Sequence, residues 1–201
     1  MRRYLLIGAT VGLLALPALA FGRATTTVNV ANNFFSPDGV TKTVGTGGIH
    51  WQWSGVFHNV RQDSRLFRSG PATSAPHSFD VVPSAGSFHY YCEVHGSRTG
   101  GMDGTLKIRP QIFNKTPTSF GVKWSPGTGD TGGKFDVRYR VNGGTWKAWK
   151  NDTTTAQGTF GLNGKPVVLR SGHTYDIQAR SEKSTDTSKS SGWSPTARVT
   201  P

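Results

Sequence analysis

The feature that most constrains the fold is a pattern of short β-branched and aromatic runs broken by Gly, Pro and Asn. Runs such as IHWQW and KFDVRYRV alternate apolar and polar side chains, and no long stretch keeps the period of a helix. The chain has 201 residues, enough for one large domain or two small ones. We therefore expect an all-β protein built from sandwiches or barrels of short strands.

The first twenty residues differ from the rest. Arg2 and Arg3 precede the apolar run YLLIGATVGLLALPALA, which ends in the small-residue pattern Ala18-Leu19-Ala20. This order is typical of a signal peptide, so we expect residues 1–20 to be removed; the alternative is an uncleaved membrane anchor. The prediction implies an exported mature chain without a transmembrane helix, in the periplasm, at the cell surface or outside the cell. The paired arginines leave Sec and twin-arginine export both open.

The remaining strand-like runs fall into two groups that meet at Pro110. Before it, we expect two strands around a turn at Ser36-Pro37-Asp38-Gly39, a strand carrying alternating tryptophans, and a closing strand in DGTLKIR. After it, about seven short strands are expected, and the polar run SEKSTDTSKSSG is expected to be an exposed loop. The predicted domains are residues 21–109 and residues 110–201.

The positive charge is unevenly distributed. The formal net charge is +12, and Lys plus Arg outnumber Asp plus Glu by eight to five in residues 21–109 and by thirteen to six in residues 110–201. The second half could therefore attract an anionic cell-surface polymer, a protein or a membrane; the alternative is a solvated positive surface. The basic residues form no dense run and lie on no helix that could enter a groove, so specific nucleic-acid binding is not expected.

The single cysteine, Cys92, is unusual in an exported chain because it cannot form an internal disulfide. It is buried and inert, paired with another chain, or a metal ligand. Alternation along SFHYYC points its thiol into the sandwich at the end of a strand. His95 follows in a glycine-rich loop that ends at Met102, and His58 in VFHNV is the natural candidate for a fourth ligand.

The side chains of these four residues narrow the choice of metal. A thiolate, two imidazoles and a weak axial thioether suit copper, which cycles between two oxidation states. Zinc is the main alternative, but methionine is a poor zinc ligand and structural zinc sites prefer more thiolates. No orienting Asn or Asp supports a Cys–His nucleophile, and the sequence has no His-x-His pair for a multicopper cluster. We therefore do not expect an enzyme.

The segments FHNV and YYCEVHGSRTGGMDGTLKI resemble the cupredoxin family, specifically the plastocyanin-like bacterial blue copper proteins, over residues 27–109. The resemblance implies a Greek-key β-sandwich that holds one type 1 copper through His58, Cys92, His95 and Met102. It also implies single-electron transfer, with the ring edge of His95 as the exit. The loop between His95 and Met102 is two residues longer than in plant plastocyanins, which leaves the reduction potential open.

Two neighbouring residues receive roles from the same resemblance. Asn59 is similar to the residue that tethers the two ligand loops in cupredoxins; the alternative is a simple turn-former. Tyr91, pointing away from the core beside Cys92, is a candidate for a second electron route; the alternative is an ordinary exposed strand aromatic. We expect the other histidines of this half to be solvated residues and not ligands: His50, His77 and His89.

The second half is similar to a fibronectin type III domain over residues 111–201, in the segments VKWSP, LRSGHTYDIQARS and SGWSP. The resemblance implies an immunoglobulin-like sandwich with Trp124 between the sheets, and a tyrosine corner formed by Leu169 and Tyr175. Such a fold does not specify a ligand. Trp146 and Trp149 either pack in the domain or form an exposed aromatic and basic patch.

Together these patterns predict an exported blue copper protein that carries single electrons. The fibronectin-like module would attach it to a surface or to an unidentified redox partner. Two alternatives remain open: a protein that buffers or delivers copper, and an adhesion or scaffold protein whose first domain holds no metal in the cell.

Overall fold

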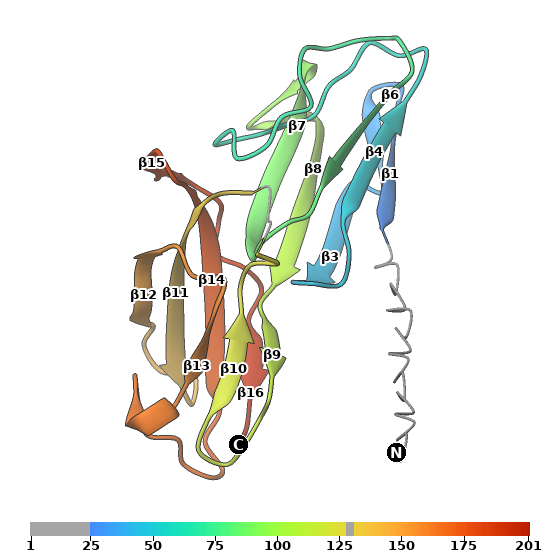
Figure 1. The fold of residues 1–201 in the computed structure, drawn as a ribbon. Coiled ribbons are helices and arrows are strands. Elements are labelled where there is room, and N and C mark those ends of the chain that lie inside the picture. The colour runs from blue at the N-terminus through green and yellow to red at the C-terminus, as the bar shows by residue number, and fades with distance from the viewer. Residues whose placement is uncertain (1–24, 128–130) are drawn as a thin grey trace, which may run out of the picture.

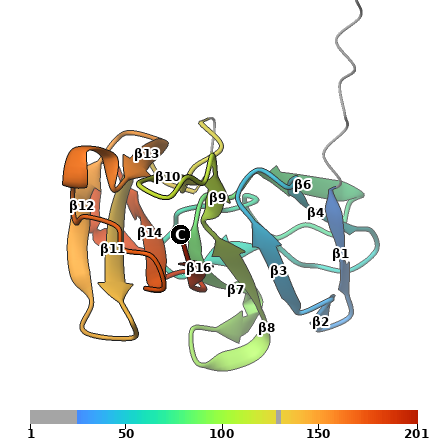
Figure 2. The ribbon, with the colours of Figure 1, turned by 90° about the horizontal axis from the view of Figure 1, so that it is seen from below.

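The computed structural model describes residues 25–127 and 131–201, so the predicted signal peptide lies outside the described residues. These residues form four β-sheets, two from each half of the chain, arranged as two sandwiches side by side (Figures 1 and 2). The prediction of an all-β chain is confirmed. Within the described ranges, no helix is long and apolar enough to cross a membrane.

The first sandwich consists of two four-stranded sheets that mix parallel and antiparallel pairs. One sheet has the order β2 (Phe34–Ser36), β1 (Thr26–Ala31), β4 (Ile49–Trp53) and β6 (His77–Val81). The other has the order β3 (Gly39–Thr43), β8 (Gly100–Arg109), β7 (Gly86–Ser97) and β5 (Arg61–Gln62). The pairs β1–β4 and β3–β8 are parallel, so each sheet joins strands that are distant in sequence.

The start of this sandwich has one more strand than we expected. A tight turn, with Asn33 at a φ of 65°, folds β2 back on β1, and β3 begins only after the expected turn at Pro37. Asparagine tolerates the left-handed conformation better than most residues do, which explains how the chain reverses there without glycine. The expected pair of strands implies one continuous strand through NNFF, which the turn at Asn33 divides.

The second sandwich contains the remaining strands. One sheet has the order β13 (Gln157–Phe160), β10 (Phe120–Lys123) and β9 (Gln111–Phe113). The other has the order β12 (Lys147–Thr153), β11 (Lys134–Val141), β14 (Tyr175–Lys183) and β15 (Asp186–Ser190), with β16 (Ala197–Val199) also paired to β14. A 3-10 turn, η1 (Leu162–Gly164), follows β13.

The prediction of an exposed loop in SEKSTDTSKSSG is wrong. Glu182 and Lys183 extend β14, and Asp186–Ser190 form β15, which pairs antiparallel with β14. The physical reason is that an edge strand needs only backbone hydrogen bonds to its neighbour, so a polar sequence with no apolar face can still form one. β15 reaches towards the first sandwich, where it contributes to the contact between the two halves (Figure 1).

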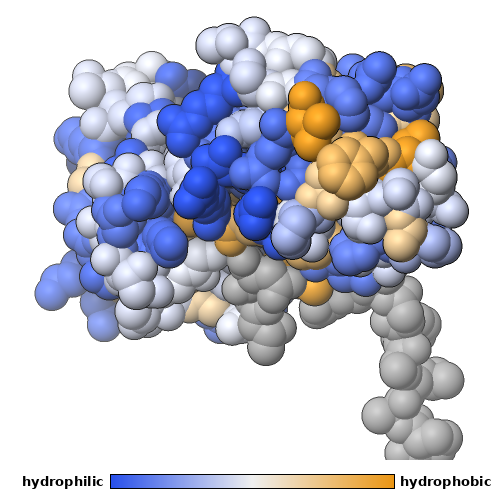
Figure 3. Space-filling model, turned by 90° about the horizontal axis from the view of Figure 1, so that it is seen from above, coloured by the Kyte–Doolittle hydropathy of each residue, from blue (hydrophilic) through white to orange (hydrophobic). Residues whose placement is uncertain are grey.

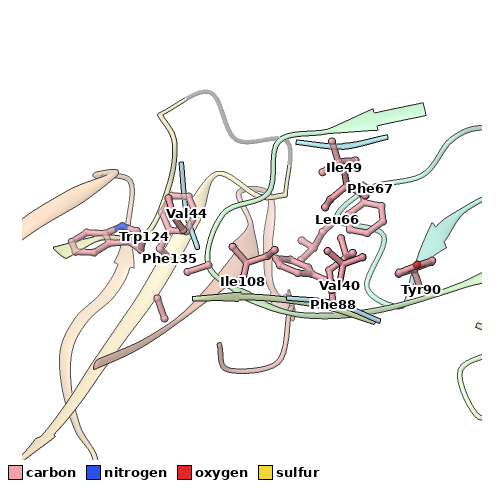
Figure 4. Close-up of a cluster of buried hydrophobic side chains, with 14 of the residues drawn as sticks. Val40, Val44, Ile49, Leu66, Phe67, Phe88, Tyr90, Ile108, Trp124 and Phe135 are labelled. Atoms are coloured by element: carbon pink, nitrogen blue, oxygen red, sulfur yellow. The ribbon is translucent and has the colours of Figure 1, made fainter. Parts of the chain in front are cut away.

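The cores follow from the alternation of side chains. Ile49, Trp51 and Trp53 of β4 point inward, and on the facing strand Phe88 and Tyr90 are fully buried. The buried apolar side chains of both halves form one continuous cluster. Figure 4 shows it running from the first sandwich to Trp124 and Phe135 in the second.

The expected features of the second half are present. Trp124 is fully buried and packs edge-on against Trp149 at a ring distance of 5.6 Å. The Tyr175 hydroxyl accepts a hydrogen bond from the backbone N–H of Arg170 at 2.8 Å, which confirms the tyrosine corner. Trp146 stacks against the guanidinium of Arg138, at 4.6 Å from the ring centre. Trp149 therefore packs in the domain, whereas Trp146 is half-buried and lies against the guanidinium groups of Arg138 and Arg140.

A polar seam joins the two sandwiches at the start of β7. Ser87 and Gly192 exchange two backbone hydrogen bonds of 2.9 and 2.8 Å, as in a short antiparallel pair. The Ala85 N–H donates to the Trp124 carbonyl at 2.7 Å, and the buried Ser181 hydroxyl donates to the Ala85 carbonyl at 3.0 Å. Because these groups are satisfied across the seam, the two halves hold a defined orientation.

Candidate metal centre

β7 places the cysteine of the site. Its alternation buries Phe88, Tyr90 and Cys92 on the core side, as expected. Pairing with β8 is regular up to Tyr91 and resumes only at Gly96, so the strand is irregular between these positions. This break releases the backbone around Cys92 from the ladder, which lets the thiol and the His95 ring turn towards the same point.

Three potential ligand atoms meet at the end of the first sandwich. Cys92 Sγ lies 3.5 Å from His58 Nδ1 and 3.8 Å from His95 Nδ1, and the two Nδ1 atoms are 3.0 Å apart. A triangle with these edges has a circumradius of about 2.0 Å, close to the bond lengths of about 2.0–2.3 Å that zinc makes with His and Cys. One ion can therefore contact all three atoms with little rearrangement.

The three residues differ in exposure. His58 and Cys92 are 1% and 0% exposed, whereas His95 lies on the surface. Burial and the neighbouring His95 both lower the pKa of His58. A lowered pKa keeps the imidazole neutral near pH 7, which leaves a lone pair available for a metal.

Met102 lies in β8 and not at the end of an open loop. The segment after His95 continues as a hairpin, in which Gly96 pairs with Gly101, so the expectation of a loop here is wrong. Glycine is required because a Cβ on Gly101 would meet the His95 carbonyl oxygen at 2.7 Å, and Gly101 also has a φ of 96°. The close pairing buries Met102 beside the His95 strand, at 1% exposure.

Asn59 links the segments that carry His58 and Cys92. Its side-chain oxygen accepts a hydrogen bond from the Glu93 N–H at 2.9 Å, and its Nδ2 donates to Glu93 Oε2 at 2.6 Å and to the Gly70 carbonyl at 2.9 Å. Asn59 is 1% exposed. The two bonds to Glu93 hold the two ligand-bearing segments together, beyond what a simple turn-former would do.

Glu93 is the residue of the site that sequence reasoning missed. Arg68 donates two hydrogen bonds to its Oε2, of 2.8 and 2.6 Å, and Arg61 lies 3.3 Å from Oε1. Burial would raise the pKa of Glu93, but the bonds from Arg68 and Asn59 outweigh it and lower the pKa. The available signal was a carboxylate in CEVH, directly after a thiol predicted to be buried.

Tyr91 lies on the outer side of β7 but is covered, at 6% exposure. The Arg61 guanidinium sits over its ring at 5.3 Å, and Arg61 Nη1 donates to its hydroxyl. The alternative of an exposed strand aromatic is therefore wrong. Tyr91 is therefore a covered residue that packs against Arg61 on the outer side of β7.

The other histidines of this half are engaged elsewhere. His50 Nδ1 lies 2.8 Å from Asp80, and His77 stacks on Trp53. His89 lies between Asp63 and Asp103, at 2.9 Å from each. Burial would lower the pKa of His89, but the two carboxylates raise it. None of the three belongs to the cluster of ligand atoms.

The end of the molecule that carries His95 is partly apolar. Phe57 and Val94, the neighbours of two ligand residues in sequence, are 54% and 49% exposed. Figure 3 views this end and shows apolar side chains gathered beside a strongly hydrophilic group. His95 thus reaches the surface next to apolar side chains, while its partners in the cluster are covered.

No model of a known protein family matches the sequence, and a search of curated proteins also finds no match. Among solved structures, the chain is similar to a reduced amicyanin variant, at 19% identity and a TM-score of 0.35, over 42% of this chain and 81% of that one. It is also similar to pseudoazurin from Hyphomicrobium denitrificans, at 17% identity and a TM-score of 0.34, over 42% of this chain and 75% of that one. A chain of a cytokine receptor complex is similar at 16% identity and a TM-score of 0.34, over 76% of this chain and 90% of that one.

At these identities and TM-scores, the likenesses do not carry the assignment of the site, which comes from its own atoms. The structure has the two β-sandwiches that the sequence predicted, each built from two sheets. The cluster of two imidazole nitrogens and one thiol has the donors and the spacing of a metal site.

Proposed function

We propose that this protein is an exported type 1 copper protein that carries single electrons. The observation that carries the proposal is the convergence of His58 Nδ1, His95 Nδ1 and Cys92 Sγ within 4.8 Å of one another at the end of a β-sandwich. Two imidazoles and one thiolate form the strong ligand plane of such sites, and a buried methionine near His95 suits the weak axial position. Copper would supply the one-electron couple.

The residues around the cluster suit this role. The hydrogen bonds of Asn59 and Glu93 hold the ligand segments in one arrangement, which keeps the geometry similar in both oxidation states. Cys92 and His58 are buried, whereas His95 is exposed, so His95 is the member of the cluster that reaches solvent. A redox partner that covers the apolar surface around His95 would approach the site through that ring.

The experiment is the addition of Cu(II) to the mature chain. The chain is purified from the exported fraction of cells, and mass spectrometry checks that it begins at Phe21. We expect an intense visible thiolate-to-copper band and a narrow EPR hyperfine splitting, with one copper per chain. Cys92→Ser should abolish the band. Asp80→Asn, a change on the outer side of the same sandwich, should leave it intact.

Other outcomes separate the alternatives. Tight Cu(I) binding without a blue Cu(II) form would favour copper buffering or delivery. No copper binding by a folded chain would leave an adhesion or scaffold protein, and would overturn the electron-carrier proposal.

For the second domain we propose attachment to a partner or an anionic surface polymer, supported by its larger excess of Lys and Arg. Salt-sensitive retention on such a polymer would test it.

A further inference from the structure

A pocket between the two sandwiches has no part in the metal centre. It has a volume of about 360 Å³, and its lining residues come from three separate segments: Arg61, Asp63, Ser64, Arg65, Arg98, Ser188 and Lys189. The residues from 61 to 65 follow the first ligand histidine, Arg98 lies at the tip of the β7–β8 hairpin, and Ser188 and Lys189 belong to β15. The pocket therefore needs both sandwiches.

The charges around this pocket are not balanced. Arg61 pairs with Glu93, and Lys189 pairs with Asp186 at 2.9 Å. In residues 25–127 and 131–201, no carboxylate lies within ion-pair distance of Arg65 or Arg98. Asp63, the one acidic lining residue, is bonded to His89, whose raised pKa favours the charged imidazolium.

The wall of the pocket is held in place before any ligand binds. Gln62 Oε1 accepts hydrogen bonds from the N–H groups of Ser64 and Leu66, which fixes the loop that presents Arg65. The Ser64 hydroxyl donates to the Ser190 carbonyl at 2.9 Å and ties this loop to β15. Arg98 Nη2 donates to the Asp63 carbonyl, which directs the guanidinium towards the same loop.

We propose that this seam pocket binds an oxyanion group, such as phosphate, sulfate or a carboxylate. Planar guanidinium groups bind such oxygens in pairs, and two of the arginines have no competing carboxylate. Figure 3 shows strongly hydrophilic side chains gathered in the middle of this end of the molecule, next to the apolar group. The second sandwich completes the site by supplying Lys189.

The test uses the metal-free full chain at low ionic strength, so that its outcome does not depend on copper. Inorganic phosphate is titrated against the protein by calorimetry and by backbone NMR. We expect saturable 1:1 binding, with shifts centred on residues 63–65, 98 and 188–189. Arg65→Gln, Arg98→Gln and Lys189→Gln should each weaken binding by roughly threefold to tenfold.

Two control variants remove the same charge elsewhere. Arg170→Gln and Lys147→Gln change exposed residues of the second sandwich that do not line the pocket, and both should bind phosphate like the wild type. A hexaglutamate peptide is titrated in parallel: tighter binding than phosphate indicates an anionic group on a larger molecule, and weaker binding indicates a free anion.

Three results would overturn the proposal. One is the absence of saturable binding by both probes. A second is equal weakening by the control variants, because net charge alone would then account for binding. A third is an unchanged affinity in Lys189→Gln, which would remove the second sandwich from the site. Circular dichroism of each variant checks that the fold is kept.

Discussion

Glu93 shows how one side chain can organise a site that it does not enter. It follows Cys92 directly, and its carboxylate is surrounded by donors from the opposite ligand segment: Asn59, Arg68 and Arg61. Hydrogen bonds to a charged group are stronger than neutral ones, and this carboxylate is only partly solvated. Because the bonds span the two ligand segments, we infer that Glu93 keeps His58 close to Cys92.

This role can be tested with Glu93→Gln, which keeps the shape of the side chain and removes its charge. We expect the free energy of unfolding to fall by about 1–2 kcal/mol, because Arg68 and Arg61 lose their partner. In the copper-loaded form, the EPR signal should broaden as the ligands become less well ordered. Denaturant unfolding and EPR are the measurements. Asp80→Asn removes an exposed carboxylate that pairs with His50, so it should lower the free energy of unfolding less and leave the EPR signal unchanged. Equal effects of the two variants would contradict the role of Glu93.

Strand β14 contains a second unusual carboxylate, Glu182, which lies close to Asp136 of β11. Glu182 is 3% exposed, and it shares the Arg180 guanidinium with Asp136, at 3.0 and 2.7 Å respectively. Burial and the Asp136 carboxylate raise the pKa of Glu182 to about 7, although Arg180 acts in the opposite direction. One guanidinium cannot neutralise both carboxylates, so the more deeply buried one, Glu182, favours the protonated form.

The raised pKa predicts a pH dependence of stability. Between the ordinary value of 4.5 and about 7, the folded chain holds a proton at Glu182 that the unfolded chain has lost. The resulting stability is present at low pH and is lost as the pH rises through 7, so the free energy of unfolding should fall by about 1 kcal/mol or more from pH 5 to pH 8.

Denaturant unfolding across this pH range measures the effect. Glu182→Gln, which stays neutral, should flatten the profile and should be more stable than the wild type at pH 8. Asp186→Asn is the matched control on the same sheet, because the pKa of Asp186 is lowered from 3.8 and lies outside the range. A profile that stays unchanged in Glu182→Gln would contradict the assignment.

The two sandwiches share more than a flexible connection. β8 ends at Arg109 and β9 begins at Gln111, so one residue separates the strands of the two halves. The buried apolar side chains form one cluster across the seam, and the polar groups there are bonded between the halves. Strand β7 carries seam contacts at Ser87 and the cysteine of the site at residue 92. Loosening one half should therefore weaken the other.

We expect the metal-free full chain to unfold in one cooperative transition by differential scanning calorimetry, because opening the seam exposes buried polar and apolar groups of both halves. On the proposed function, copper should bind only the folded first sandwich and yet raise the midpoint of the whole transition. Hydrogen exchange of β14 should slow as well. Two separate transitions, of which copper moves only one, would show that the halves unfold independently.

The sequence by itself determined the all-β class, the inward face of β4 and β7, the buried Trp124 and the tyrosine corner. These features depend on alternation and on contacts within a few residues, which consecutive side chains encode. It also indicated where Cys92, His95 and Met102 gather, because they share one hairpin.

Only the tertiary structure decided the rest. The approach of His58 to Cys92, the donors around Glu93 and the contact of Arg61 with Tyr91 all join segments 25 or more residues apart. The edge strand β15 forms through backbone hydrogen bonds, which the pattern of its polar side chains does not predict. The seam pocket exists only where that strand meets the first sandwich. Such features depend on which distant segments pair, and a local sequence pattern does not specify that pairing.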